Sequence, residues 1–155
     1  MSLFDSNENS NNESHRFLEF MLGHESYAVE LLKVKEVITP PELTPIPKAP
    51  PHVLGLMNLR GLVLTVVDLR KKLAITPDED DSQNGVIIFD LGERLLGVVV
   101  DSIQKVLNIH QDKIKPVPDT DKNTSYILGV LQHESRLTMW IEPTLLLESD
   151  IKKAA

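Results

Sequence analysis

The sequence predicts an all-β protein of two small barrels packed side by side, with a short C-terminal helix. Short aliphatic and β-branched runs recur along the chain, separated by turn residues such as Gly, Pro, Asn and Asp. They form two sets of about five, each roughly 60 residues long, on either side of an acidic break, TPDEDDSQNG, at residues 76–85. Because a barrel this small buries little apolar surface, we expect the two to share an interface along doubly apolar strands such as Leu95–Val100.

The first part of the chain gives a disordered tail and then the first barrel. Residues 1–15 are rich in Asn, Ser and acidic residues and have few aliphatic ones, which predicts the tail. The first barrel covers about residues 16–76. Its expected strands are 16–22, 27–29, 34–38, 56–59 and 62–67, with a single helical turn within 30–35.

Six prolines between Pro40 and Pro51 mark a connector inside the first barrel. Each proline fixes φ and removes a backbone donor, so we expect an extended crossover between two strands. A PxxP segment that binds an aromatic-lined groove is the alternative. Residues 51–55 are expected to form a short helical turn that ends at Gly55.

The stretch LGLMNLRGLVLTVVDLRKKL, residues 54–73, is the most distinctive of the chain. Two apolar runs flank Arg60-Gly61, and Gly61 tolerates positive φ, so this pair predicts a hairpin turn with Arg60 at the rim of the sheet. After Asp68 the apolar spacing changes to four residues, from Leu69 to Leu73. This change predicts a short helix with Asp68 as its N-cap.

The second barrel is predicted at about residues 86–142, after a linker at about 77–85. Its expected strands are 86–91, 95–100, 102–109, 126–131 and 137–141, with a polar loop over 113–123. Glu142-Pro143 begins the C-terminal helix, expected at about 143–149 with three leucines as its apolar edge.

Composition excludes several classes of function. A net charge of −7 without a basic stripe argues against a nucleic-acid partner. The chain has no cysteine and its five histidines are scattered, so we expect no metal site, and phosphate-binding and nucleophile-elbow motifs are absent, so we expect no cofactor. Without a signal-like start or an apolar run of about 20 residues, we expect a cytoplasmic protein with no membrane insertion.

Asp68 and Asp101 are the one pair that suggests an enzyme. Each ends an apolar strand, and two carboxylates that met in a cleft could perform acid–base chemistry, as in a small β-barrel hydrolase. The structural interpretation is that each accepts backbone N–H bonds at a corner of the chain. No nucleophile of matching type lies near either aspartate in the sequence, so no catalytic residue is assigned.

Several motifs in order resemble the CheW-like family, the adaptor modules of bacterial chemotaxis. They are FLEFMLGHESYAV, LLKVKEVI, PIPKAPPHVLGLMNLRG, VVDLR, LLGVVVD and YILGV, and they span about residues 16–147. The resemblance implies two five-stranded SH3-like β-barrels and a CheW-like domain at 16–150. It also implies a non-enzymatic scaffold that binds chemoreceptor cytoplasmic tips and the regulatory domain of a CheA-type histidine kinase, in the cytoplasm at the membrane-associated receptor array. A related pathway that controls surface motility by pili is the alternative, and self-association into rings stays open.

The candidate site combines a prediction from the residues with the resemblance. Glu36 and Arg60 are expected to be cross-strand partners, either as an internal ion pair or at the rim of a binding groove. The resemblance places Val34, Glu36 and Arg60 in the receptor-binding groove, with Asn58 and Gly61 completing the motif. It assigns no kinase-binding residue.

The chain departs from the family pattern at two places. The family often has Pro where this chain has Thr65. It also has an acidic-ended aliphatic strand where this chain has Met139-Trp140-Ile141-Glu142. The second departure affects the expected contacts of the second barrel.

Overall fold

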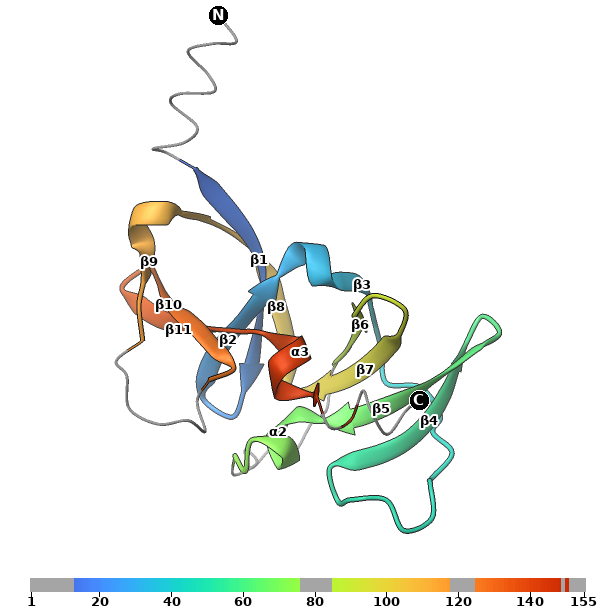
Figure 1. The fold of residues 1–155 in the computed structure, drawn as a ribbon. Coiled ribbons are helices and arrows are strands. Elements are labelled where there is room, and N and C mark those ends of the chain that lie inside the picture. The colour runs from blue at the N-terminus through green and yellow to red at the C-terminus, as the bar shows by residue number, and fades with distance from the viewer. Residues whose placement is uncertain (1–12, 76–84, 118–124, 149, 151–155) are drawn as a thin grey trace, which may run out of the picture.

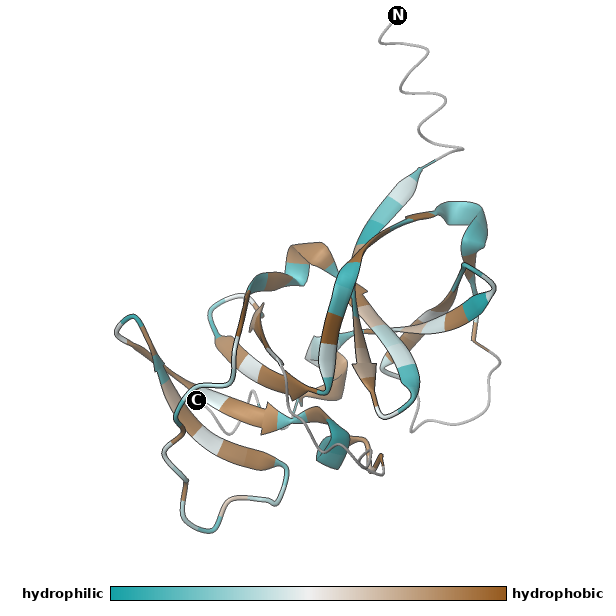
Figure 2. Cartoon of the chain, turned by 180° about the vertical axis from the view of Figure 1, so that it is seen from behind, coloured by the Kyte–Doolittle hydropathy of each residue, from teal (hydrophilic) through white to brown (hydrophobic). Residues whose placement is uncertain are grey.

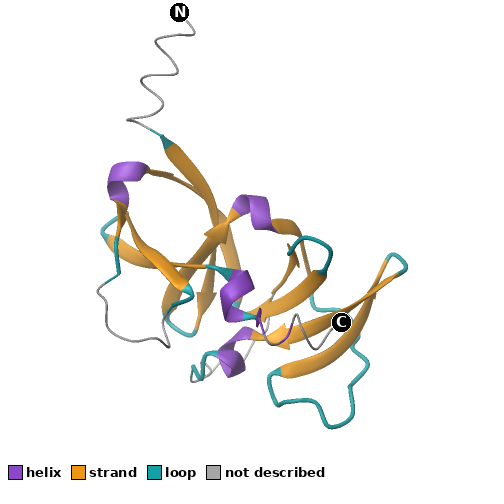
Figure 3. Cartoon of the chain, in the orientation of Figure 1, coloured by secondary structure: helices purple, strands orange, loops and turns teal. Residues whose placement is uncertain are grey.

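The computed structural model describes residues 13–75, 85–117, 125–148 and 150, which form strands joined by loops and short helical turns (Figures 1 and 3). The strands are β1 (Ser14–Leu22), β2 (Glu25–Glu30), β3 (Val34–Ile38), β4 (Val53–Leu59), β5 (Leu62–Asp68), β6 (Gly85–Asp90), β7 (Leu95–Val100), β8 (Ser102–His110), β9 (Ile114–Lys115), β10 (Ile127–His133) and β11 (Arg136–Ile141). The helical turns are η1 (Leu31–Lys33), α2 (Leu69–Lys72), η2 (Gln111–Lys113) and α3 (Pro143–Leu146).

The strands form two sheets. The six-stranded sheet has the order β8-β1-β2-β11-β10-β9, and the five-stranded sheet has the order β3-β6-β7-β5-β4. Each contains one parallel pair, β2 with β11 and β5 with β7. The predicted all-β fold with two β units is confirmed. The sixth strand, β9, has only two residues and pairs with β10, so the expected polar loop at 113–123 contains a short strand near its start.

The sheets do not follow the predicted barrel boundaries at 16–76 and 86–142. The hairpin β1–β2 comes from the first block of sequence, yet it pairs with β8 and β11 from the second. Conversely, β6 and β7 from the second block complete the sheet of β3, β4 and β5. The acidic break separates blocks of sequence, but the partner of each strand is set by long-range packing that local turn signals do not encode.

The boundaries of several segments also differ from the predicted ones. β1 begins at Ser14, because Gln111 N donates to Glu13 O over 2.8 Å and Ser14 pairs with His110. Residues 1–12 of the predicted tail and 77–84 of the predicted linker lie outside the described residues. The linker's last residue, Gly85, already belongs to β6. The helix α3 ends at Leu146, earlier than predicted, and residue 149 is not described.

The expected helical turn at 51–55 is wrong, because β4 begins at Val53 and Gly55 lies inside it. Gly55 has φ +148°, and a Cβ there would lie 2.5 Å from the carbonyl oxygen of Thr44. Thr44 and Leu56 exchange two backbone hydrogen bonds, of 2.9 and 2.8 Å. The glycine therefore allows the proline connector to pass directly against β4.

The core lies in three clusters, of which the largest joins the two sheets. It includes Phe20 and Val29 from the six-stranded sheet and Val98 and Phe89 from the five-stranded sheet. Neighbouring Val99 faces a second cluster inside the five-stranded sheet, so β7 is buried on both faces. The expected apolar interface along 95–100 is thus present. Figure 2 shows hydrophobic segments along the strands and hydrophilic ones at the turns.

Candidate functional site

The predicted site residues lie at the two edges of the five-stranded sheet. β3, one edge strand, carries Val34 and Glu36, and the β4–β5 hairpin, at the other edge, carries Arg60 at its tip. Arg60 and Gly61 have φ angles of +50° and +92°, as in a two-residue turn with positive φ at both positions. Asn58 stabilises this turn, because its Oδ1 accepts a hydrogen bond of 2.8 Å from Gly61 N.

An ion pair joins the two edges. Arg60 Nη2 lies 2.5 Å from Glu36 Oε1, and the side chains are 68% and 27% exposed, respectively. The structure therefore brings Glu36 and Arg60 together, as predicted. Most of the Arg60 guanidinium still faces solvent, so an internal ion pair and an exposed rim coexist at this position.

Val34 has a different environment from Glu36. The pairing of β3 with β6 shifts between them, since Val34 lies opposite Phe89 and Glu36 lies opposite Ile88. This bulge breaks the alternation that would place both side chains on one face. Val34 is half-buried and packs against the cluster between the sheets, whereas Glu36 contacts the hairpin tip.

Several exposed apolar side chains lie close in sequence to the two residues of this ion pair. Leu32, on the turn η1 just before β3, is 92% exposed, and Val37 on β3 is 43% exposed. Leu62 and Val63, which follow the Arg60-Gly61 turn, are 54% and 67% exposed. The prediction missed Leu32, although two adjacent leucines in a one-turn helix cannot both face the core.

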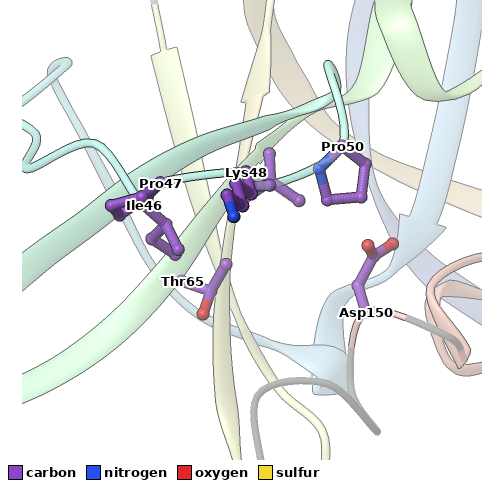
Figure 4. A pocket seen from close by; sticks show the side chains of 8 residues that line it. Ile46, Pro47, Lys48, Pro50, Thr65 and Asp150 are labelled. Carbon is purple, nitrogen blue, oxygen red and sulfur yellow. The ribbon is translucent and has the colours of Figure 1, made fainter.

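Two hollows flank the hairpin β4–β5. One, of about 370 Å³, is lined by Leu56, residues 62–65 and residues 93–95, which span the end of the β6–β7 turn and the start of β7. The other, of about 340 Å³, lies beside the proline connector and is lined by Ile46, Pro47, Lys48, Ala49, Pro50, Val53, Thr65 and Asp150 (Figure 4). The Asp150 carboxylate in its wall already has two partners, His52 Nε2 at 2.6 Å and Lys72 Nζ at 3.2 Å.

The carboxylates of the hydrolase alternative, Asp68 and Asp101, have structural partners. Asp68 caps α2, and its Oδ1 accepts hydrogen bonds from the backbone N of Arg70 and of Lys71, at 2.9 and 3.4 Å. Asp101 Oδ1 lies 3.0 Å from Arg70 Nη1, and its Oδ2 accepts from Gly23 N. Neither aspartate lines the two hollows, so this arrangement gives the alternative no support.

Among the described residues, no group of three or more His, Cys, Asp or Glu side chains could hold a metal ion. Within the same ranges no helix has the length and apolar character needed to cross a membrane.

Comparison with known proteins decides the family. A family model described as the CheW-like domain matches residues 16–150. The chain belongs to the CheW-like family. It is 33% identical to the chemotaxis protein CheW of Klebsiella aerogenes, a match that covers 86% of this chain and 82% of that protein. It is 31% identical to the chemotaxis protein CheW of Rhizobium meliloti, with 93% and 94% covered.

A solved structure agrees with this assignment. The scaffolding protein TtCheW from Thermoanaerobacter tengcongensis superposes with a TM-score of 0.79 at 27% identity, over 86% of this chain and 92% of that one. The resemblance to the CheW-like family is therefore confirmed. In general terms, this CheW-like protein is a chemotaxis scaffold or adaptor.

Proposed function

We propose that this CheW-like protein is a non-enzymatic adaptor that couples chemoreceptors to a CheA-type histidine kinase, in the cytoplasm at the membrane-associated receptor array. The observation that carries the proposal is the exposed apolar and charged rim at residues 32–37 and 60–63, on a fold whose family consists of adaptors. Large apolar side chains at such exposure are typical of a surface that a partner covers.

The receptor tip is proposed to contact η1, β3 and the hairpin tip. A helical partner docks with its apolar face in a groove and its polar face toward a charged edge. Leu32 supplies the exposed apolar group, and the Glu36–Arg60 pair supplies the charged edge. Val34 supports this surface from below, through its contact with the core between the sheets.

The kinase regulatory domain is proposed to use the hollow lined by Leu62 and Val63. An adaptor needs a second surface, and these exposed side chains border a hollow of about 370 Å³ with Glu93 and Arg94 at its rim. A pull-down from the native cytoplasm identifies which kinase is bound. Recovery of a kinase that controls pilus motility would favour the surface-motility alternative.

Leu32→Glu tests the receptor surface. Because Leu32 is 92% exposed, the variant should fold like the wild type. Against a receptor helix the new carboxylate would be desolvated without a partner, so the affinity for a purified receptor cytoplasmic fragment should fall roughly a hundredfold. The measurement is isothermal titration calorimetry, with thermal melting of the free protein.

Leu137→Glu is the matched control, because Leu137 is 61% exposed on the six-stranded sheet. This control should bind the receptor fragment like the wild type. Equal affinities for Leu32→Glu and wild type would place the receptor surface elsewhere. Val34→Glu is less informative, since its half-buried side chain contacts the core and its replacement should lower the melting temperature too.

Arg60→Ala separates the two roles of the ion pair. An exposed pair contributes about 1 kcal/mol or less to folding, so the free energy of unfolding should change little. If Arg60 meets an acidic group of the receptor, the affinity should fall roughly tenfold or more. A loss of stability with unchanged affinity would show that Arg60 serves only the fold.

A further inference from the structure

A buried arginine lies where the two sheets meet. Arg70 belongs to α2, the one-turn helix that follows β5 of the five-stranded sheet, and it is 5% exposed. Its Nε lies 3.8 Å from Asp68 Oδ1 and its Nη1 lies 3.0 Å from Asp101 Oδ1. One guanidinium therefore contacts the carboxylate at the end of β5 and a second carboxylate just after the end of the neighbouring strand β7.

Asp101 marks the point where the chain crosses between the sheets. It lies between β7 of the five-stranded sheet and β8 of the six-stranded sheet. Its Oδ2 accepts a hydrogen bond from Gly23 N in the β1–β2 turn, and its backbone N donates to Met21 O over 3.1 Å. Arg70 is thus connected, through Asp101, to the β1–β2 hairpin of the other sheet.

The same helix makes a second connection. Lys72 Nζ lies 3.2 Å from Asp150 Oδ2, at the end of the segment that follows β11 and α3. Asp150 is 3% exposed and is also bound by His52 Nε2, just before β4. The short helix α2 therefore contacts, through two of its charged side chains, both the crossover from β7 to β8 and the segment that follows β11 and α3.

We propose that Arg70 is a positioning residue that fixes the orientation of the two sheets relative to each other. The apolar cluster between the sheets holds them together but does not by itself fix the angle between them, because burial of apolar surface is non-directional. A buried guanidinium held as an ion pair between two carboxylates resists rotation of one sheet against the other, because such a rotation would separate buried opposite charges.

The orientation matters for the binding surface because the sheets have a second crossover. The chain passes from β2 through η1 to β3, and this crossover carries Leu32 and Glu36. A rotation at Asp101 changes how η1 and β3 lie against the six-stranded sheet. This last step rests on the proposed function, whereas the orientation itself can be measured without any partner.

Spin labels test the orientation directly. The chain has no cysteine, so Lys35→Cys on β3 and Asn108→Cys on β8, both at exposed positions, give one label on each sheet. Arg70→Met should broaden or shift the distribution of label distances, measured by pulsed electron paramagnetic resonance below the melting temperature. Arg70→Lys, which keeps the charge but loses the fork, should give an intermediate distribution.

Arg136→Met is the matched control. Arg136 also pairs with a buried carboxylate, that of Glu19, but both residues belong to the six-stranded sheet. The control should lose stability and keep the wild-type distance distribution. Should Arg70→Met fail to fold, Arg70→Lys and Asp101→Asn carry the same test.

Wild-type distance distributions in every folded variant at Arg70 and Asp101 would overturn the proposal. A changed distribution supports it, whatever the receptor affinity. If the distances change while the affinity for the receptor fragment stays that of the wild type, the receptor surface is wrongly placed and the role of Arg70 stands.

Discussion

At the scale of single residues, the most unusual group is a carboxylate without solvent contact. Glu19 on β1 is 0% exposed, and its Oε2 accepts hydrogen bonds from Ser26 Oγ at 2.7 Å and Arg136 Nη2 at 2.6 Å. Thr138 Oγ1 continues the network, 2.8 Å from Ser26 Oγ and 2.9 Å from His133 Nε2. The network joins β1, β2, β10 and β11, and so fixes their register from inside the six-stranded sheet.

Removal of the cation in this network should be costly. Arg136→Met leaves the Glu19 charge buried, which we expect to lower the free energy of unfolding by about 2 to 4 kcal/mol, less than for a fully buried pair because Arg136 is 43% exposed. Glu19→Gln in the same background should recover most of the loss, since a neutral amide needs no cation. Urea unfolding of both single variants and the double variant measures the coupling, and additive effects would contradict it.

The structural roles of some residues could be predicted from their sequence neighbours, and those of others could not. Asp68 as a cap and Gly61 as a turn follow from backbone needs that only a few residue types meet, and the structure shows both. The contact of Glu36 with Arg60 follows from opposite charges on strands expected to be neighbours. Glu19 and Arg136 lie 117 residues apart, so no local pattern could indicate that a charge within an apolar strand has a buried partner.

At the scale of elements, β4 shows how a strand depends on the segment beside it. Its backbone pairs with β5 on one side and exchanges hydrogen bonds with Thr44 of the proline connector through Leu56. The contact needs a residue without a side chain at position 55. The sequence indicated the connector and the strand, but the close approach of the two depends on tertiary packing.

Gly55→Ala and Gly61→Ala form a matched pair, because both glycines have positive φ. At Gly61 an added Cβ meets nothing within 4 Å, so only backbone strain of about 1 kcal/mol is expected. At Gly55 the Cβ would meet the Thr44 carbonyl, so the loss should be larger, on the order of 3 kcal/mol. Chemical denaturation measures the free energy of unfolding of both variants. Equal losses of stability would mean that the connector can move away from β4.

At the scale of the whole molecule, the chain belongs to a single folding unit although it has two sheets. The β1–β2 hairpin leaves the rest of its sequence block to join β8 and β11, and the largest apolar cluster spans both sheets. The number and sequence of most strands were predictable from alternating apolar runs. Their distribution between the sheets was not, because a strand with two apolar faces fits either sheet equally well until its neighbours are known.

Separate expression of residues 1–76 and 77–155 tests this view. Neither fragment contains a complete sheet, so neither should show the dispersed amide resonances of a folded protein. Mixing the two should restore a folded complex, because the missing strand partners are then present. A folded fragment 1–76 would show that β1 to β5 can form a sheet of their own.

The parallel pairing of β2 with β11 also has a consequence for synthesis on the ribosome. Ser26 and Thr138, which share a hydrogen bond, are 112 residues apart. At about 5–20 residues per second, roughly 5–20 s pass between the emergence of the first hairpin and that of the strand that completes its sheet. During that interval Phe17 lacks Trp140 of β11, whose ring packs against it with the centroids 5.2 Å apart, so this face of the nascent hairpin stays open to chaperones at the tunnel exit.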